Sequence, residues 1–168
     1  MPTTATTNKS DAPLARPPLV LLVCTGNICR SPMAAALLRH YLPPGSPWRV
    51  ASAGTAACDG DAASEYAVTA LAEMQIDHTG HRSQRLTERL VREAQVIVAM
   101  ARNHRDEILA RYPVANQKVF LLRAFDPRAR EDKDLPDPIG GPLATYRHCR
   151  DAIAAALPEL IEFLHDRY

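Results

Sequence analysis

Two reactive residues, Cys24 and Arg30, flank a short polar loop and are separated by five residues. A thiolate is a strong nucleophile, and a planar guanidinium group binds two oxygens of a phosphate at once, which a lysine does not do. The two residue types at this spacing predict a site at which a cysteine attacks the phosphorus atom of a phosphorylated group.

The residues on either side of the loop predict the elements that hold it. The apolar run 19–23 is typical of a strand buried in a parallel sheet, and it places Cys24 at the carboxyl end of that strand. Ser31 and Pro32 predict the start of a helix, with Ser31 as N-cap and Pro32 at the first helical position. The loop therefore curls around a helix N-terminus, where backbone N–H groups and the helix dipole favour an anion of about phosphate size.

Three residues of this segment have a predicted task in shaping the loop. Gly26 permits tight curvature, and Asn27 tolerates a left-handed backbone conformation while its side chain pins the loop. The hydroxyl of Ser31 is expected to donate a hydrogen bond to the sulfur of Cys24. That bond favours the thiolate at rest and again when sulfur is the leaving group.

Strands and helices alternate along the rest of the chain, which is typical of an α/β fold with right-handed crossovers. We expect further strands at 48–52, 95–99 and 118–122, and helices at 31–42, 62–74, after Thr87, at 100–111 and at 142–164. The predicted architecture has three layers, a four-stranded parallel sheet with helices on both faces. Ligands of such sheets bind beyond the carboxyl ends of the strands, where Cys24 lies.

Length and composition limit the class of protein. The chain has 168 residues and a net charge of +1, so we expect one domain over 19–168 and neither nucleic acid nor an anionic membrane as a partner. Residues 1–18 are rich in Thr, Ala and Pro and are predicted to form a disordered tail. No apolar run approaches the roughly 20 residues of a membrane span, which makes the cytoplasm the default location. The composition favours no particular oligomeric state.

The four cysteines, at 24, 29, 58 and 149, are too few and too scattered for a secreted disulfide framework. Cys24 and Cys29 have a Cys-x4-Cys spacing, but the chain offers no second pair of this kind, only the adjacent His148 and Cys149, so no metal site is expected. Cys58 and Cys149 receive no predicted role.

Residues 23–34, Val-Cys-Thr-Gly-Asn-Ile-Cys-Arg-Ser-Pro-Met-Ala, resemble the phosphate-binding loop of the low-molecular-weight protein tyrosine phosphatases. The resemblance continues through nearly all of residues 19–165. It implies hydrolysis of phosphotyrosine in a phosphorylated protein substrate, through a cysteinyl-phosphate on Cys24 and without metal or organic cofactor. The phosphate would be bound by the loop residues Thr25, Gly26, Asn27, Ile28, Cys29 and Arg30.

A phosphatase of this kind also needs a carboxyl group that protonates the leaving oxygen and later activates water. The polar segment 124–141 offers several, and we favour Asp137, because Asp-Pro-Ile-Gly-Gly-Pro combines a turn with a fixed proline and the helix behind it. The resemblance agrees, since the family's general acid is the Asp of an Asp-Pro pair in this loop. Asp126, which precedes Pro127, is the competitor, but it follows the fourth strand too closely.

The resemblance further suggests a supporting shell around the loop, formed by Asn27, Ser31, Ser52 and His81, with His78 as the alternative to His81. Cys29 either packs under the loop or forms a reversible disulfide with Cys24, as its family counterpart does. The remaining histidines are expected to be solvated, namely His40, His104, His148 and His165.

The substrate class has one competing interpretation. Asp-Pro-Ile-Gly-Gly is similar to the Asp-Pro-Phe-Gly-Gly form of bacterial protein arginine phosphatases, which, however, typically have Thr where this chain has Ile28. A branched apolar side chain there favours the tyrosine-type pocket. Arsenate reductases share the fold but need further cysteines to pass on a disulfide, and a non-catalytic phosphoprotein-binding module would lack the acid or the nucleophile.

Overall fold

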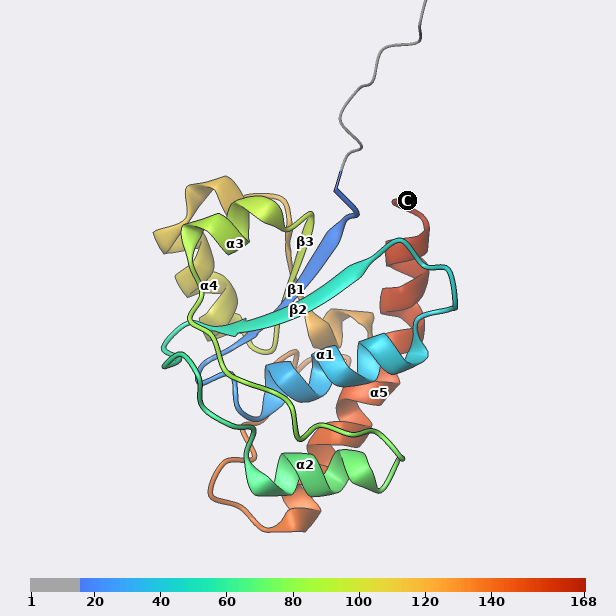
Figure 1. Ribbon diagram of the computed structural model, residues 1–168. Helices are drawn as coiled ribbons and strands as arrows, with labels where there is room; N and C mark the ends of the chain where they lie inside the picture. Colours follow the sequence, from blue (N-terminus) through green and yellow to red (C-terminus); the bar gives the residue numbers. More distant parts are fainter. Residues whose placement is uncertain (1–15) are drawn as a thin grey trace, which may run out of the picture.

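The computed structural model describes residues 16–168 (Figure 1). The predicted tail, residues 1–18, therefore lies almost entirely outside the described residues. Pro18 at its end is buried, and its carbonyl oxygen accepts a hydrogen bond of 2.8 Å from the backbone N–H of Arg49. This bond extends the pairing of the first two strands by one residue.

The sheet has four parallel strands in the order β2-β1-β3-β4, as predicted. The strands are β1 (Leu19–Cys24), β2 (Arg49–Gly54), β3 (Val96–Ala99) and β4 (Val119–Leu121). Cys24 pairs with Gly54 in β2, and Val23 pairs with Ala99 in β3. The carboxyl ends of the three strands therefore lie level with the predicted nucleophile.

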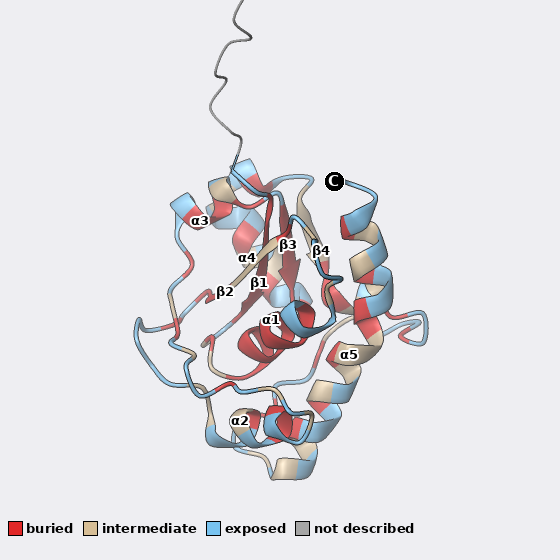
Figure 2. Cartoon of the chain, turned by 45° about the vertical axis from the view of Figure 1, so that its right-hand side comes forward, coloured by how far each residue is buried: buried red, intermediate tan, exposed pale blue. Residues whose placement is uncertain are grey.

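Helices cover both faces of the sheet, which confirms the predicted three layers (Figures 1 and 2). One face carries α1 (Arg30–Tyr41) and α5 (Leu143–His165), and the other carries α3 (Glu88–Glu93) and α4 (Arg102–Arg111). Helix α2 (Glu65–Ala72) packs against α5 and lies away from the strands (Figure 1). Short 3-10 turns at Pro113–Ala115 and Leu122–Phe125 flank β4.

Strand β1 is buried along its whole length, because its side chains alternate between two cores. Val20 and Leu22 belong to the core shared with α1 and α5, whereas Leu21 and Val23 belong to the core under α3 and α4. Each fully buried side chain of this size contributes about 1.5–3 kcal/mol. The central strand is therefore a rigid base for Cys24.

The N-cap and the first helical position of α1 lie two residues earlier than expected. Its first residue is Arg30 and its N-cap is Cys29, whose side chain makes no capping hydrogen bond, so the prediction of Ser31 as N-cap is wrong. The hydroxyl of Ser31 lies instead against Cys24 and Asn27. The N-terminus of α1 is thus left without a side-chain cap, and its orphan N–H groups remain free to bind an anion.

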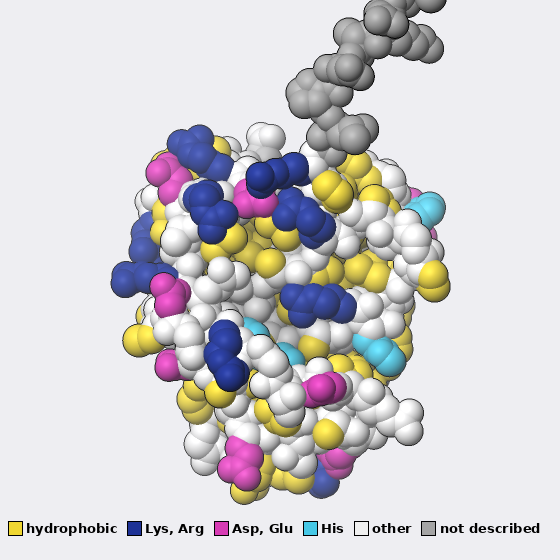
Figure 3. Space-filling model, viewed as in Figure 1, with side chains coloured by type: hydrophobic (Ala, Val, Ile, Leu, Met, Phe, Trp, Pro, Cys, Tyr) yellow, Lys and Arg dark blue, Asp and Glu magenta, His cyan; other side chains and the backbone are white. Residues whose placement is uncertain are grey.

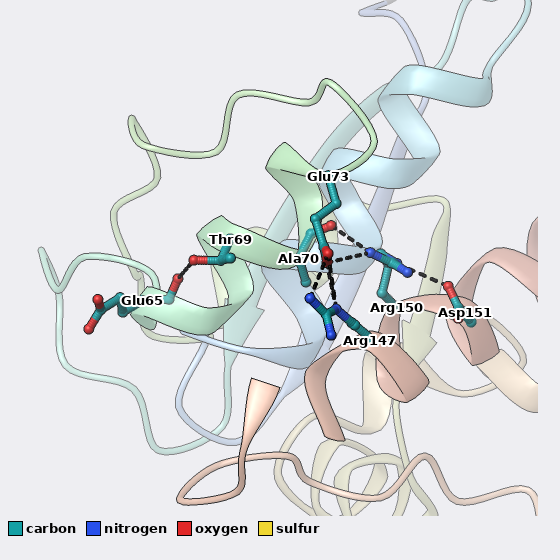
Figure 4. Close-up of polar contacts among 7 residues, drawn as sticks. All are labelled: Glu65, Thr69, Ala70, Glu73, Arg147, Arg150 and Asp151. Carbon is teal, nitrogen blue, oxygen red and sulfur yellow. Dashed lines mark hydrogen bonds and ion pairs between the residues drawn. The ribbon is translucent and has the colours of Figure 1, made fainter. Parts of the chain in front are cut away.

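A charged cluster ties α2 to α5 (Figure 4). Glu73, at the end of α2, pairs with Arg147 at 2.9 Å and Arg150 at 3.1 Å, and Arg150 also donates to the carbonyl oxygen of Ala70 at 2.9 Å. The cluster fixes α2, and with it the preceding Ser64, beside the phosphate-binding loop. Within residues 16–168, no helix has both the length and the apolar composition that a membrane crossing requires.

Candidate active site

Cys24 lies at the carboxyl end of the central strand and is 3% exposed. Its sulfur is 2.9 Å from the hydroxyl oxygen of Ser31. The carbonyl oxygens of Cys24 and Thr25 accept hydrogen bonds from the N–H groups of Thr55 (2.9 Å) and Ala56 (3.0 Å). The base of the loop is thereby fastened to the chain that leaves β2.

Gly54 makes this close approach possible. A Cβ atom at this position would lie 2.4 Å from the carbonyl oxygen of Thr25 and 2.8 Å from the Cβ of Ala57, closer than such atoms approach. The strand predicted at 48–52 ended before Gly54, and no role was predicted for this glycine. The structure extends β2 to Gly54, which pairs directly with Cys24.

Asn27 is the centre of the loop's internal support. It is fully buried with φ 57°, the left-handed conformation predicted for it, and its amide nitrogen donates to Ser31 (2.8 Å) and Ser52 (3.0 Å). Its side-chain oxygen accepts from the backbone N–H of Gln84 at 2.9 Å. Every polar atom of this side chain is used, so the loop is held in shape before any ligand arrives.

His81 completes the support from outside the loop, with its Nε2 2.7 Å from the carbonyl oxygen of Asn27. Burial lowers the pKa of His81, so the neutral ring donates its Nε2 proton to that carbonyl. The structure thus brings together Asn27, Ser31, Ser52 and His81, the four residues of the expected shell.

His78 does not contact the loop. Its ring stacks on His81 with centroids 5.3 Å apart, it is 6% exposed, and burial lowers its pKa to about 4. Both rings line a cavity of about 660 Å³, together with Arg39, His40 and Arg82. Figure 3 shows histidine side chains beside Lys and Arg side chains on this face of the molecule. Geometry therefore selects His81 over its neighbour.

Arg30 connects the loop to the predicted acid. Its guanidinium donates to the carbonyl oxygen of Leu135 at 3.0 Å and pairs with the carboxylate of Asp137 at 3.4 Å, although 107 residues separate the two partners of this pair. The side chain of Arg30 is 7% exposed and that of Asp137 is 43% exposed. The acid therefore lies at the mouth of the site, above a buried guanidinium.

A tight turn orients Asp137. The other oxygen of its carboxylate accepts from the N–H of Ile139 at 3.1 Å, and the N–H of Gly141 donates to the carbonyl oxygen of Pro138 at 2.9 Å. Gly140 has φ 78°, which glycine adopts without the strain of a side chain.

Asp126, the competing carboxylate, has a structural task. It is 4% exposed, accepts from the N–H of Arg128 at 2.9 Å and pairs with the guanidinium of the same residue at 3.4 Å. These contacts close the turn that follows β4.

Cys29 packs under the loop with a free thiol. It is 4% exposed, donates to the hydroxyl of Ser64 at 3.2 Å and lies 3.5 Å from the hydroxyl of Tyr146. Burial raises the pKa of Cys29, and burial also raises the pKa of Tyr146 to about 12. Cys29 is therefore a thiol in this state, and its disulfide with Cys24 stays a prediction.

His104 is a residue that sequence reasoning missed. We expected a solvated ring, and this is wrong, because His104 is fully buried with Nε2 2.8 Å from the hydroxyl of Thr25. Burial lowers its pKa to about 4, so the ring that holds Thr25 is neutral. Its position in the first turn after β3, at the carboxyl edge of the sheet, was the available signal.

The family is decided by comparison with known proteins. The sequence model of the family described as "Low molecular weight phosphotyrosine protein phosphatase" matches residues 19–167. The chain belongs to this family. A protein-arginine-phosphatase of Geobacillus stearothermophilus is 42% identical over 145 residues, which cover 86% of this chain and 95% of the relative.

Two further similarities relate the chain to both tyrosine phosphatases and arginine phosphatases. The probable low molecular weight protein-tyrosine-phosphatase EpsP of Ralstonia solanacearum is 44% identical over 135 residues, covering 80% of this chain and 86% of EpsP. The solved structure of the YwlE arginine phosphatase from G. stearothermophilus superposes with a TM-score of 0.81 at 41% identity, covering 90% of this chain and 95% of that one. The protein is thus a phosphatase of this family, acting on phosphorylated protein.

Proposed function

We propose that this phosphatase hydrolyses phosphotyrosine in proteins through a cysteinyl-phosphate on Cys24, within a single catalytic domain over residues 19–168. The observation that carries the proposal is the contact between Arg30 and Asp137 beside a buried cysteine. The nucleophile Cys24 and the anion-binding Arg30 belong to one loop, and Asp137 reaches Arg30 from a distant part of the chain. The thiolate chemistry requires a reducing compartment, which favours the cytoplasm.

In the first half-reaction the sulfur of Cys24 attacks phosphorus. The S–P bond forms while the bond from phosphorus to the tyrosine oxygen breaks, and Asp137 gives its proton to that oxygen. Arg30 and the backbone N–H groups of residues 25–30 stabilise the equatorial oxygens. The phosphate replaces the carboxylate of Asp137 as the partner of the guanidinium. The released carboxylate takes up a proton from solvent before it serves as the acid, and it returns that proton when the pair with Arg30 forms again.

In the second half-reaction Asp137 takes a proton from a water molecule as that water attacks phosphorus. The S–P bond breaks, and the leaving thiolate accepts a hydrogen bond from Ser31, whose oxygen lies 2.9 Å from the sulfur. Free phosphate and the starting enzyme result, so the cycle balances with this chain's own residues and water.

The choice of phosphotyrosine is supported by the apolar side chains near the loop. Ile28 is half-buried and packs against the core under α1, and Ile139 is 57% exposed beside Asp137. An aryl ring gains free energy from contact with such side chains, whereas a guanidinium group needs hydrogen-bond partners that Ile28 does not provide.

The decisive measurement ranks kcat/KM for matched phosphotyrosine and phosphoarginine peptides. We expect the phosphotyrosine peptide to be the better substrate, and a preference for phosphoarginine would contradict the proposal. Ile28→Thr should raise relative activity on phosphoarginine, because it supplies a hydroxyl. Ile28→Val is the matched control, since valine has the shape of threonine without the hydroxyl.

Two other functions gain no support from the site. An arsenate reductase passes a disulfide between cysteines, but Cys149 is 5% exposed on α5 and burial raises its pKa to about 12, so it is a poor thiolate. A binding module would lack the nucleophile or the acid. Turnover of p-nitrophenyl phosphate by the wild type and by Cys24→Ser separates catalysis from binding, and equal rates would disprove the mechanism.

A further inference from the structure

The first turn of α4 lies between the two loops of the active site. Arg102 and His104 belong to this turn, which follows directly after β3. Arg102 contacts the segment that carries the acid, and His104 contacts the phosphate-binding loop. Neither side chain takes part in the chemical steps of the proposed mechanism.

Arg102 and Asp134 form a multiple contact. The carboxylate of Asp134 accepts from the backbone N–H of Arg102 at 2.7 Å, from its Nε at 3.2 Å and from its Nη2 at 3.0 Å. The same carboxylate therefore binds the N-terminus of α4 and forms a fork with the guanidinium. A bidentate pair of this kind fixes direction as well as distance.

The contact is transmitted to Asp137 over three residues. Leu135 is 1% exposed, its N–H donates to the carbonyl oxygen of Met100 at 2.9 Å, and its own carbonyl oxygen accepts from Arg30 at 3.0 Å. Pro136 follows with its restricted backbone angle. Little freedom remains between the anchored Asp134 and the carboxylate of Asp137.

His104 fixes the opposite loop from the same turn. Its Nε2 lies 2.8 Å from the hydroxyl of Thr25, which is the residue after the nucleophile, and the ring is fully buried. One rigid helical turn is therefore in contact with both halves of the site.

We propose that Arg102 and His104 are positioning residues, and that the turn they share sets the distance between the sulfur of Cys24 and the carboxylate of Asp137. This inference rests on the proposed function, because it assigns the turn a part in protonation of the leaving group by Asp137. A displacement of about 1 Å in a reacting group can cost up to about 10²-fold in rate, so an exposed pair that contributes little stability can still matter for catalysis.

The test compares leaving groups of different basicity. Phenyl phosphate needs protonation of its departing oxygen far more than p-nitrophenyl phosphate, and kcat/KM reports the step that forms the cysteinyl-phosphate. We expect Arg102→Gln and Asp134→Asn each to lower kcat/KM for phenyl phosphate about 5- to 10-fold, but for p-nitrophenyl phosphate at most about 2-fold. The double variant should fall no further than either single variant.

The matched control is Arg92→Gln, which breaks a comparably exposed pair of 3.0 Å with Glu88 on α3. It should leave both rates unchanged. Arg102→Lys keeps the charge but not the fork, so it should restore only part of the loss. Thermal unfolding of all variants is measured in parallel, and we expect nearly equal midpoints.

The His104 half of the inference has its own readout. His104→Gln retains a side chain that can hydrogen-bond to Thr25, whereas His104→Leu does not. We expect the leucine variant to lose activity on both substrates and the glutamine variant to recover most of it. Equal losses in the two variants at matched stability would overturn this part.

Asp137→Asn is the reference for both hypotheses. A steep dependence on the leaving group in this variant, with a flat one in Arg102→Gln and Asp134→Asn, would overturn the positioning role and leave the proposed function intact. A flat dependence in Asp137→Asn itself would contradict the acid assignment of the proposed function, and the positioning role would fall with it.

Discussion

The two loops of the active site are built in opposite ways. The phosphate-binding loop is held by buried side chains, of which Asn27 and Ser31 are fully buried, and its backbone is hydrogen-bonded to the segment that follows β2. The loop that carries the acid, residues 124–141, is long and mostly exposed, and the carboxylate of Asp137 reaches the site from the surface. An anion receptor works best when its donors are fixed in advance, whereas an acid must release one partner and approach another.

The largest expected loss of activity follows a change in the phosphate-binding loop, at Arg30. Arg30→Lys keeps the positive charge but loses the planar fork, so we expect kcat/KM for p-nitrophenyl phosphate to fall by about 10³-fold. Single-turnover kinetics and phosphate binding by calorimetry measure the change. Arg92→Lys is the matched control on the surface of α3 and should be silent. A loss below about 10-fold in Arg30→Lys would show that charge alone suffices.

Stability should separate the two loops clearly. Asn27→Ala leaves Ser52 and the N–H of Gln84 without their buried partner, and we expect it to lower the free energy of unfolding by about 2–4 kcal/mol. Asp137→Ala should cost less, up to about 1 kcal/mol, because its carboxylate is 43% exposed although it pairs with the buried Arg30. Urea denaturation of both variants tests the comparison. Equal losses would mean that the acid loop is as integral to the fold as the receptor.

How much of this could be predicted from the sequence differs between the loops. The apolar run before Cys24 and the helix after it predicted the strand, the receptor and the left-handed Asn27, because these features are local. Asp137 was favoured from its turn residues and from the family resemblance, and the structure places its carboxylate beside Arg30. The contacts of Gln84, Gly54 and His104 with the loop were missed, because each joins segments that meet only when parallel strands align.

Substitution of a glycine beside each loop should show a smaller difference in stability between the two loops. Gly54→Ala brings a methyl group to within 2.4 Å of the carbonyl oxygen of Thr25, and we expect it to destabilise the protein by about 1–3 kcal/mol and to impair phosphate binding. Gly140→Ala meets no atom within 4 Å, so it suffers only the strain of φ 78°, about 1 kcal/mol. Thermal unfolding and phosphate affinity distinguish the two. Unchanged phosphate affinity in Gly54→Ala would show that the end of β2 does not control the shape of the phosphate-binding loop.

Low pH should lower the free energy of unfolding by a smaller amount, through two buried histidines near the phosphate-binding loop. His78 and His104 have pKa values of about 4 against an ordinary value of 6.5, so the unfolded chain binds their protons first as the pH falls. Stability should fall between pH 6.5 and 4, by about 1 kcal/mol for each histidine between pH 7 and 5.5. Urea denaturation at the two pH values measures this. His78→Gln should reduce the pH dependence, and exposed His165→Gln should not; a pH-independent wild type would contradict the prediction.

The location of Cys24 on a strand with a partner on each side has a consequence for partial unfolding. Amide hydrogen exchange should be slowest in β1, while the segment around Asp137 opens without disturbing the sheet. A molecule open at that segment would keep the phosphate-binding loop but would lack the acid in its place beside Arg30. Proteolysis confined to the segment around Asp137 would therefore leave a protein that binds phosphate but hydrolyses its substrate slowly.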